Sequence, residues 1–161
     1  MDAKSEAKRT TIEKKSDREI VVRRTFDAPA RIVFEAWSKP ELFKRWWVPK
    51  SIGMTLVSCE QDVRTGGRYR LEFGQGMAFF GRYVEVTPHS RIVWTNEESG
   101  EDGSVTTVTF DEQDGKTLLT LNELYPSKEA FERTGGAEDG LSESFDQLEA
   151  LLIATHLTST R

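Results

Sequence analysis

A strand-like stretch from Met77 to Val86 contains the residue pair best placed for acid–base chemistry, Tyr83 and Glu85. Residues two apart in a strand point to the same face, so an inward Tyr83 would bring Glu85 inward as well. A buried carboxylate needs a partner or acquires an altered pKa, and beside a tyrosine hydroxyl it could donate or accept a proton. Glu35 and Glu123 are weaker candidates for the same role.

The alternation of this stretch leaves open which of its faces is buried. One face would carry Phe79, Gly81, Tyr83 and Glu85, and the other Phe80, Arg82, Val84 and Val86. Both sets mix aromatic or apolar residues with a charged one, so hydrophobicity alone does not choose between them.

The other residues able to do chemistry favour structural roles. His89 lies in a Pro-His-Ser turn and His156 near the end of the last predicted helix, positions typical of solvated side chains. Cys59 is the only cysteine, which excludes an internal disulfide, and in a predicted strand it is interpreted as a small buried residue. No residues have metal-ligand or phosphate-loop spacing, so we expect no catalytic residue, metal or cofactor.

Charged residues concentrate between Asp62 and Arg70. Asp62, Arg64, Arg68 and Arg70 are interpreted as cross-strand ion pairs on a solvated face, with anion binding as the alternative.

The composition excludes several functional classes. The chain has 161 residues and a net charge of -5, and no block of Lys and Arg that could bind nucleic acid stands out. It has no run of about 18 apolar residues and no leader-like N-terminus, so we expect a cytoplasmic protein without a membrane partner.

Hydrophobic periodicity predicts the order of elements around these residues. The predicted strands are Glu19–Phe26, Met54–Glu60, Arg68–Phe73, Met77–Val86, Arg91–Thr95, Ser104–Phe110 and Lys116–Leu124. The predicted helices are Pro29–Trp37, Pro40–Trp46, Lys128–Arg133 and Ala137–His156. We therefore expect an α+β fold with a curved antiparallel sheet of about six or seven strands wrapped around a long C-terminal helix. Residues 1–18 would be a disordered charged tail, 19–156 a single domain and 157–161 a frayed C-terminus.

The last helix must lie against the sheet, because it has one apolar stripe. Leu141, Phe145, Leu148, Leu151 and Leu152 recur at helical spacing, whereas the opposite face is polar and expected to stay solvated. The helix alone cannot fill a strongly curved sheet. The remaining space is either packed by aromatic side chains or left as a pocket.

The adjacent tryptophans Trp46 and Trp47 point in different directions, because neighbours on a helix are about 100° apart. One should enter the core and the other a rim or cavity. Alternatively, both fill the core.

Five segments resemble the homologues of the heat-shock-protein-90 ATPase activator. They are Phe26-Asp27-Ala28-Pro29, Val33-Phe34-Glu35-Ala36-Trp37, Leu42-Phe43-Lys44-Arg45-Trp46-Trp47-Val48-Pro49, the run from Cys59 to Arg70, and Gly81-Arg82-Tyr83-Val84-Glu85-Val86-Thr87-Pro88. The resemblance covers about Glu19 to Ala154. It implies the START-like, birch-pollen-allergen-like helix-grip superfamily (SRPBCC), whose members typically enclose an apolar cavity and in a minority are enzymes. Here Gly140 is followed by Leu141 where the family often has tryptophan, which would enlarge or reshape that end of the cavity.

The leading hypothesis is a non-enzymatic binding module for a small hydrophobic or aromatic molecule. Its expected ligand-binding residues are Phe34, Trp37, Trp46, Trp47, Tyr69, Leu71, Phe73, Phe79, Tyr83, Glu85, Trp94, Leu141, Phe145 and Leu148. Aromatic rings offer stacking and edge contacts, and tyrosine hydroxyls and indole nitrogens can orient a polar group.

Two alternatives remain. One is an enzyme that moves a proton with Glu85 and Tyr83. The other, suggested by the resemblance, is an interaction protein that stimulates a chaperone ATPase. The exposed edges of the predicted sheet are compatible with a homodimer.

Overall fold

The computed structural model describes residues 10–74, 76–98, 100, 103–134 and 137–159. The strands are β1 (Thr10–Ser16), β2 (Glu19–Phe26), β3 (Ser58–Gln61), β4 (Arg68–Gly74), β5 (Met77–Thr87), β6 (Arg91–Thr95), β7 (Val105–Gln113) and β8 (Lys116–Leu124). The helices are α2 (Ala30–Ser38), α3 (Pro40–Phe43), the 3-10 turn η1 (Lys50–Ile52), α4 (Lys128–Thr134) and α5 (Ala137–Ser159).

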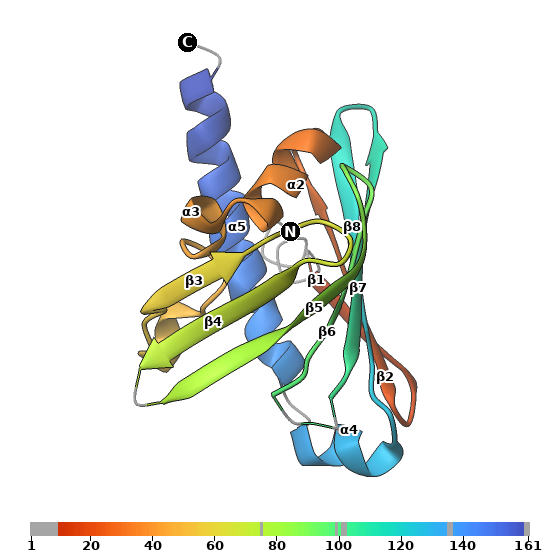
Figure 1. The fold of residues 1–161 in the computed structure, drawn as a ribbon. Helices are drawn as coiled ribbons and strands as arrows, with labels where there is room; N and C mark the ends of the chain where they lie inside the picture. Colours follow the sequence, from red (N-terminus) through yellow and green to blue (C-terminus); the bar gives the residue numbers. More distant parts are fainter. Residues whose placement is uncertain (1–9, 75, 99, 101–102, 135–136, 160–161) are drawn as a thin grey trace.

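The strands form one curved antiparallel sheet in the order β1-β2-β8-β7-β6-β5-β4-β3. Figure 1 shows β3, β4 and β5 crossing in front of α5, whereas β6, β7 and β8 stand beside it. The predicted α+β fold with a sheet around a C-terminal helix is confirmed. The sheet has eight strands rather than six or seven.

The additional strand is β1, so the prediction of a disordered tail is wrong for Thr10–Ser16. This segment pairs along β2 from Thr10 opposite Arg24 to Ser16 opposite Glu19. Its side chains are mostly exposed, and for this reason no hydrophobic alternation marks it as a strand. Backbone pairing with β2 defines it instead. Residues 1–9 lie outside the described residues.

Three other element boundaries differ from the predicted ones. The strand predicted from Met54 begins only at Ser58, and Met54 and Val57 are exposed. The second helix ends at Phe43, after which the Trp46 and Trp47 amides both donate to the Phe43 carbonyl in a turn. The predicted frayed end is helical to Ser159.

Helix α5 packs against the concave face of the sheet through its apolar stripe. Phe145 and Leu148 are fully buried and Leu151 and Leu152 nearly so, whereas Leu141 is only partly buried. Phe145 meets Phe26 of β2 edge to face, with ring centroids 5.8 Å apart. The stripe predicted from helical spacing therefore forms the centre of the core.

A buried arginine, which the sequence pattern did not single out, also joins α5 to the sheet. Arg24 of β2 has a side chain only 1% exposed and donates to Asp146 Oδ1 at 2.6 Å and to Glu149 Oε1. It also donates to Thr10 Oγ1 at 3.0 Å. Burying a guanidinium is tolerable only when carboxylates accept its hydrogens, so this cluster holds β1, β2 and α5 together.

No helix in the described part of the chain combines the length and the apolar character that crossing a membrane requires.

Candidate functional site

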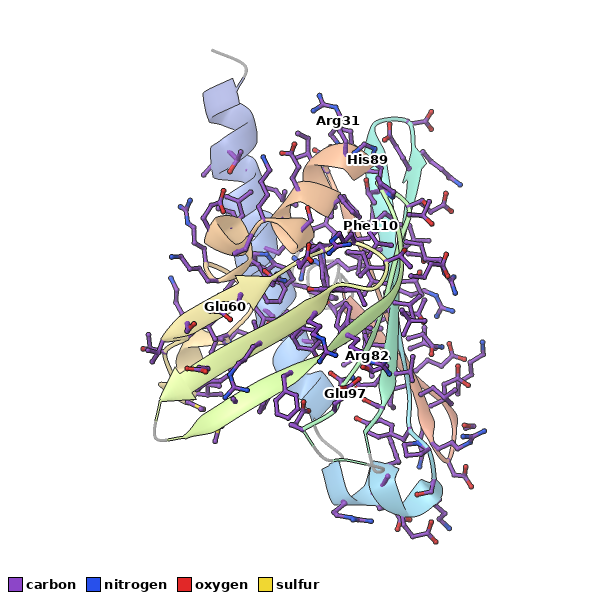
Figure 2. The ribbon with its side chains drawn as sticks, viewed as in Figure 1. Arg31, Glu60, Arg82, His89, Glu97 and Phe110 are labelled. Atoms are coloured by element: carbon purple, nitrogen blue, oxygen red, sulfur yellow. The ribbon has the colours of Figure 1, made fainter. Side chains whose placement is uncertain are left out.

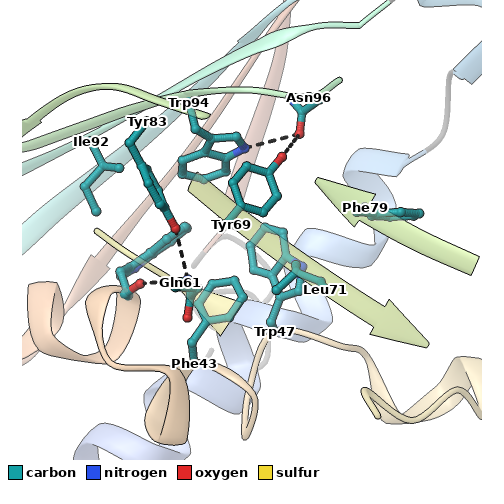
Figure 3. Close-up of a pocket in the computed structure, with 11 residues that line it drawn as sticks. Phe43, Trp47, Gln61, Tyr69, Leu71, Phe79, Tyr83, Ile92, Trp94 and Asn96 are labelled. Carbon is teal, nitrogen blue, oxygen red and sulfur yellow. Dashed lines mark hydrogen bonds between the residues drawn. The ribbon is translucent and has the colours of Figure 1, made fainter. Parts of the chain in front are cut away.

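A small, partly open cavity lies between the α2–α3 segment and the inner faces of β3, β4, β5 and β6 (Figure 3). Its volume is about 40 Å³. Its lining is mainly aromatic and includes no charged side chain: Trp37, Phe43, Trp47, Gln61, Tyr69, Leu71, Phe79, Tyr83, Ile92, Trp94 and Asn96.

The paired tryptophans separate as one of the two sequence hypotheses expected. Trp46 is fully buried, and its Nε1 donates to the Ala36 carbonyl at 2.9 Å. Trp47 is only partly buried, lines the cavity and stacks on Phe43 with ring centroids 4.9 Å apart. Trp37 packs edge to face against both indoles. One tryptophan is thus a core residue and the other a cavity wall.

Polar groups of α5 hold the loop that carries these tryptophans. Ser144 Oγ donates to the Trp47 carbonyl at 2.7 Å. Gln147 Nε2 donates to the carbonyls of Trp46 at 2.8 Å and Val48 at 2.9 Å. The sequence analysis expected the polar face of this helix to stay solvated, but on this flank it binds backbone that helix α3 leaves without helical partners.

One polar cluster of the lining is centred on Asn96. The Tyr69 hydroxyl donates to the Thr95 carbonyl at 2.9 Å and lies 3.1 Å from Asn96 Oδ1, which also accepts from Trp94 Nε1 at 3.2 Å. The opposing Gly81 makes room for Tyr69, since a Cβ there would lie 1.9 Å from the Thr95 carbonyl oxygen and 3.0 Å from the tyrosine ring.

A second polar cluster pairs Gln61 of β3 with Tyr83 of β5. Gln61 Nε2 donates to Tyr83 Oη at 3.2 Å and contacts the Trp37 carbonyl at 3.5 Å. Burial raises the pKa of the Tyr83 hydroxyl, and it also raises the pKa of Tyr69, to which nearby Glu98 adds. Both hydroxyls therefore remain protonated near neutral pH and serve as neutral hydrogen-bonding groups.

The prediction that an inward Tyr83 brings Glu85 inward is wrong. The pairing of β5 with β6 shifts between these residues, with Tyr83 opposite Trp94 but Glu85 opposite Val93. This bulge turns the Glu85 side chain to solvent, where it is 46% exposed and lies 3.3 Å from Arg91 Nε. The carboxylate proposed for proton transfer is therefore outside the cavity.

The other expected site residues divide into three groups. Trp37, Trp47, Tyr69, Leu71, Phe79, Tyr83 and Trp94 line the cavity. Phe73 and Leu141 line a neighbouring groove. Phe34, Trp46, Phe145 and Leu148 are buried core residues that line neither space.

The sequence analysis missed Phe43, Gln61, Ile92 and Asn96, which line the same cavity. Phe43 and Gln61 lie inside the segments that carry the family resemblance, and this position could have marked them as candidate site residues. Asn96 follows the short strand β6 and has no such signal.

The neighbouring groove is open and largely apolar, with a volume of about 400 Å³. It lies between η1, the beginning of α5 and the β4–β5 hairpin, and it is lined by Trp47, Val48, Pro49, Ile52, Met54, Phe73, Met77, Phe79, Gly140, Leu141 and Ser144. Trp47 and Phe79 line both the groove and the cavity. These two side chains therefore form the partition between the two spaces.

The expected cross-strand ion pairs among Asp62, Arg64, Arg68 and Arg70 are not found among the described residues. Arg70 instead pairs with Glu72, two residues along its own strand. Arg64 pairs at 2.9 Å with Asp62, two residues before it in the loop after β3. Arg82 of β5 pairs with Glu97 at 2.8 Å (Figure 2). Hydrogen bonds from Arg82 and Thr95 lower the pKa of the Glu97 carboxyl. Asp62 and Glu97 line an open recess together with the charged residues Glu60, Arg68 and Arg70.

The remaining candidates behave as structural residues. Burial raises the pKa of the Cys59 thiol to about 11, so it is a poor nucleophile at neutral pH. His89 is exposed and packs edge to face on Phe34, and the His156 side chain lies outside what the structure describes. Within the described residues, no group of His, Cys, Asp and Glu could hold a metal ion.

Comparisons with solved structures show the same fold. A protein of Rhodobacter sphaeroides is 20% identical, with a TM-score of 0.78, over 90% of this chain and 99% of that one. A protein of Staphylococcus epidermidis is 28% identical, with a TM-score of 0.72, over 90% and 94%. CalU16 of Micromonospora echinospora is 22% identical, with a TM-score of 0.65, over 92% and 87%. No curated protein matches this chain.

Residues 27–153 match the family described as "Activator of Hsp90 ATPase homolog 1-like protein". This match covers most of the chain, including every residue of the cavity lining. The chain therefore belongs to the Activator of Hsp90 ATPase homolog 1-like protein family.

Proposed function

We propose that this protein binds a small hydrophobic or aromatic molecule in the groove and the cavity together. The observation that supports the proposal is that Trp47 and Phe79 line both spaces. A flat molecule lying in the groove could reach the aromatic lining of the cavity by displacing one of these two rings.

The volumes support this two-part site over the cavity alone. A cavity that holds benzene has a volume of about 150 Å³, and ligand pockets typically have about 300–1,000 Å³. The cavity of about 40 Å³ is too small for either, whereas the groove of about 400 Å³ is large enough. A ligand that occupies the cavity as well as the groove therefore requires the partition to move.

The partition is the least confined part of the aromatic lining. Phe79 is 41% exposed and Trp47 is partly buried, whereas Trp37 is only 2% exposed and cannot move without disturbing the core. We expect Phe79 and Trp47 to change rotamer on binding, and Trp37 to stay fixed.

Binding is a better-supported role than proton transfer. Glu85, the carboxylate of the enzyme hypothesis, points to solvent, and the raised pKa values of Tyr69 and Tyr83 keep both hydroxyls protonated. Stimulation of a chaperone ATPase, a cytoplasmic location and a homodimer stay predictions. An ATPase assay with the chaperone in the presence of excess protein tests the first of these.

Intrinsic tryptophan fluorescence tests the proposal, because Trp47 borders the site. Titration with flavonoids, fatty acids and polyketides should change the emission for at least one class. Phe79→Ala removes half of the partition and should change the affinity. Val84→Ala is the matched control, because Val84 is 53% exposed on the same strand and lines neither space. No change with any ligand at high micromolar concentration would contradict the proposal.

A further inference from the structure

Most polar atoms of the cavity lining are already paired with one another. Asn96 Nδ2 donates to the Ser104 carbonyl, Ser104 Oγ and Thr106 Oγ1. Asn96 Oδ1 accepts from Trp94, and the Tyr69 hydroxyl donates its one hydrogen to the Thr95 carbonyl or to Asn96. The Asn96 cluster therefore has no donor left for a ligand.

Two donors of the lining remain without an acceptor in the described part of the structure. Trp37 Nε1 is buried and has no hydrogen-bond partner there. Tyr83 Oη accepts from Gln61 Nε2, but no acceptor for the tyrosine's own hydrogen is present among the described residues. Both side chains are more than nine-tenths buried, and both line the same cavity.

These two groups differ chemically from the rest of the site. An indole N–H can only donate, and a protonated tyrosine that already accepts one hydrogen bond has its hydrogen to offer. A buried donor without an acceptor is unfavourable, so native structures rarely leave one unsatisfied without a reason. Two residues of the cavity lining therefore each have a hydrogen for which the described residues supply no acceptor.

We infer that the ligand of this site is uncharged and places an acceptor oxygen, such as a ketone carbonyl, against Trp37 Nε1 and Tyr83 Oη. This inference rests on the proposed function and specifies the chemistry of its ligand. A carbonyl oxygen has two lone pairs and can accept both hydrogens.

The described lining has no charged side chain, which excludes charged ligands. A carboxylate or an ammonium group would lose its hydration on entering, and no side chain of opposite charge lines the cavity to compensate. A hydrocarbon would leave both donors unsatisfied. A neutral acceptor satisfies both donors without burying a charge.

A water molecule bound at Tyr83 Oη is the competing occupant, because the cavity exceeds the 10–15 Å³ or so that one water needs. A ligand carbonyl would then replace this water and its hydrogen bonds. A ligand without an acceptor would displace the water with no such replacement.

Calorimetric titration with 1-indanone and indane tests the inference, because the two molecules share a flat shape and differ mainly in a carbonyl. We expect 1-indanone to bind about tenfold more tightly, the size of one or two net hydrogen bonds. Tyr83→Phe should reduce this preference about threefold or more. Tyr125→Phe is the control and should leave both affinities unchanged, because Tyr125 is buried against Phe131 and does not line the cavity.

A measurement on the unmodified protein makes the test independent of any variant. In ¹H–¹⁵N spectra, the Trp37 indole proton should move downfield with 1-indanone and not with indane. Equal binding of the two molecules, or an unshifted Trp37 proton in the ketone complex, would overturn the inference and leave the proposed function standing. If neither molecule bound up to its solubility limit, the inference would also be overturned, whereas the proposed function would be decided by the fluorescence titrations.

Discussion

The two flanks of helix α5 hold different parts of the molecule by different means. On one flank, Asp146 and Glu149 form ion pairs with the buried Arg24 of β2. On the other, Ser144 and Gln147 form neutral hydrogen bonds to the backbone of the tryptophan loop. The ion pairs attach the helix to the sheet. The neutral hydrogen bonds hold the tryptophan loop in place, and Trp47 of this loop lines the groove.

This difference shows what the polar residues of a helix can do when its apolar stripe is already buried. Phe145 and Leu148, which lie on the apolar stripe between the two flanks, are both fully buried. The polar contacts decide which segments lie beside the helix and whether the space next to them is filled. The variants below either break this contrast or measure it.

The largest expected effect separates the two tryptophans on the loop. Trp46→Ala should lower the free energy of unfolding by about 3–5 kcal/mol, because Trp46 is fully buried and donates to the Ala36 carbonyl. Trp47→Ala should cost about 1–2 kcal/mol, since Trp47 is only partly buried. Urea denaturation measures both, and equal losses would mean that Trp47 is also a core residue.

The ion-paired flank is tested with two neighbouring arginines. Arg24→Met should cost about 2–3 kcal/mol, less than a fully buried pair because the Asp146 side chain is 64% exposed and can be hydrated again. Arg23→Met is the matched control and should change stability by less than about 0.5 kcal/mol, since its pair with Glu13 is exposed. A similar cost for both variants in chemical denaturation would show that the Arg24 cluster contributes no more than a surface pair.

The neutral flank is tested at Gln147. Gln147→Leu removes the bonds to the Trp46 and Val48 carbonyls and should cost about 1–2 kcal/mol. Amide exchange in the loop should also become faster, because its anchor is lost. Gln113→Leu, at an exposed strand end, is the control. Unchanged exchange near Trp47 would indicate that Ser144 and Glu143 hold the loop without Gln147.

The smallest effect concerns the sheet near the cavity and appears only at alkaline pH. The Cys59 thiol has its pKa raised from 9.0 to about 11 in the folded state, so the folded protein keeps a proton that the unfolded chain releases. The stabilisation that Cys59 contributes is fully present below pH 9 and is lost as the pH rises toward 11. Because Cys59 is half-buried, the loss should be on the order of 1 kcal/mol at most.

Cys59→Val has no thiol to ionise, so its stability should fall less than that of the wild type between pH 8 and pH 10.5. Urea denaturation at the two pH values measures this difference. Parallel losses in the two proteins would mean that Cys59 is as well hydrated as in the unfolded chain.

Local periodicity was enough to predict most of the elements and the class of fold. The alternation of Tyr69, Leu71 and Phe73 predicted the inner face of β4, and the spacing of Phe145 and Leu148 predicted the buried side of α5. The candidate site was predicted only in part, since the aromatic residues were found but not divided between core, cavity and groove. That division depends on which rings face one another across strands.

The sequence by itself determined the hairpin succession of strands and the long amphipathic helix, because each follows from residues close together in the chain. It left open whether Trp46 and Trp47 separate or both fill the core. Only the tertiary structure decided that Thr10–Ser16 is a strand, that a bulge turns Glu85 outward, and that Gln61 and Asn96 join the cavity. These features depend on pairing between segments distant in sequence. Such pairing leaves no local pattern of hydrophobicity to predict it from.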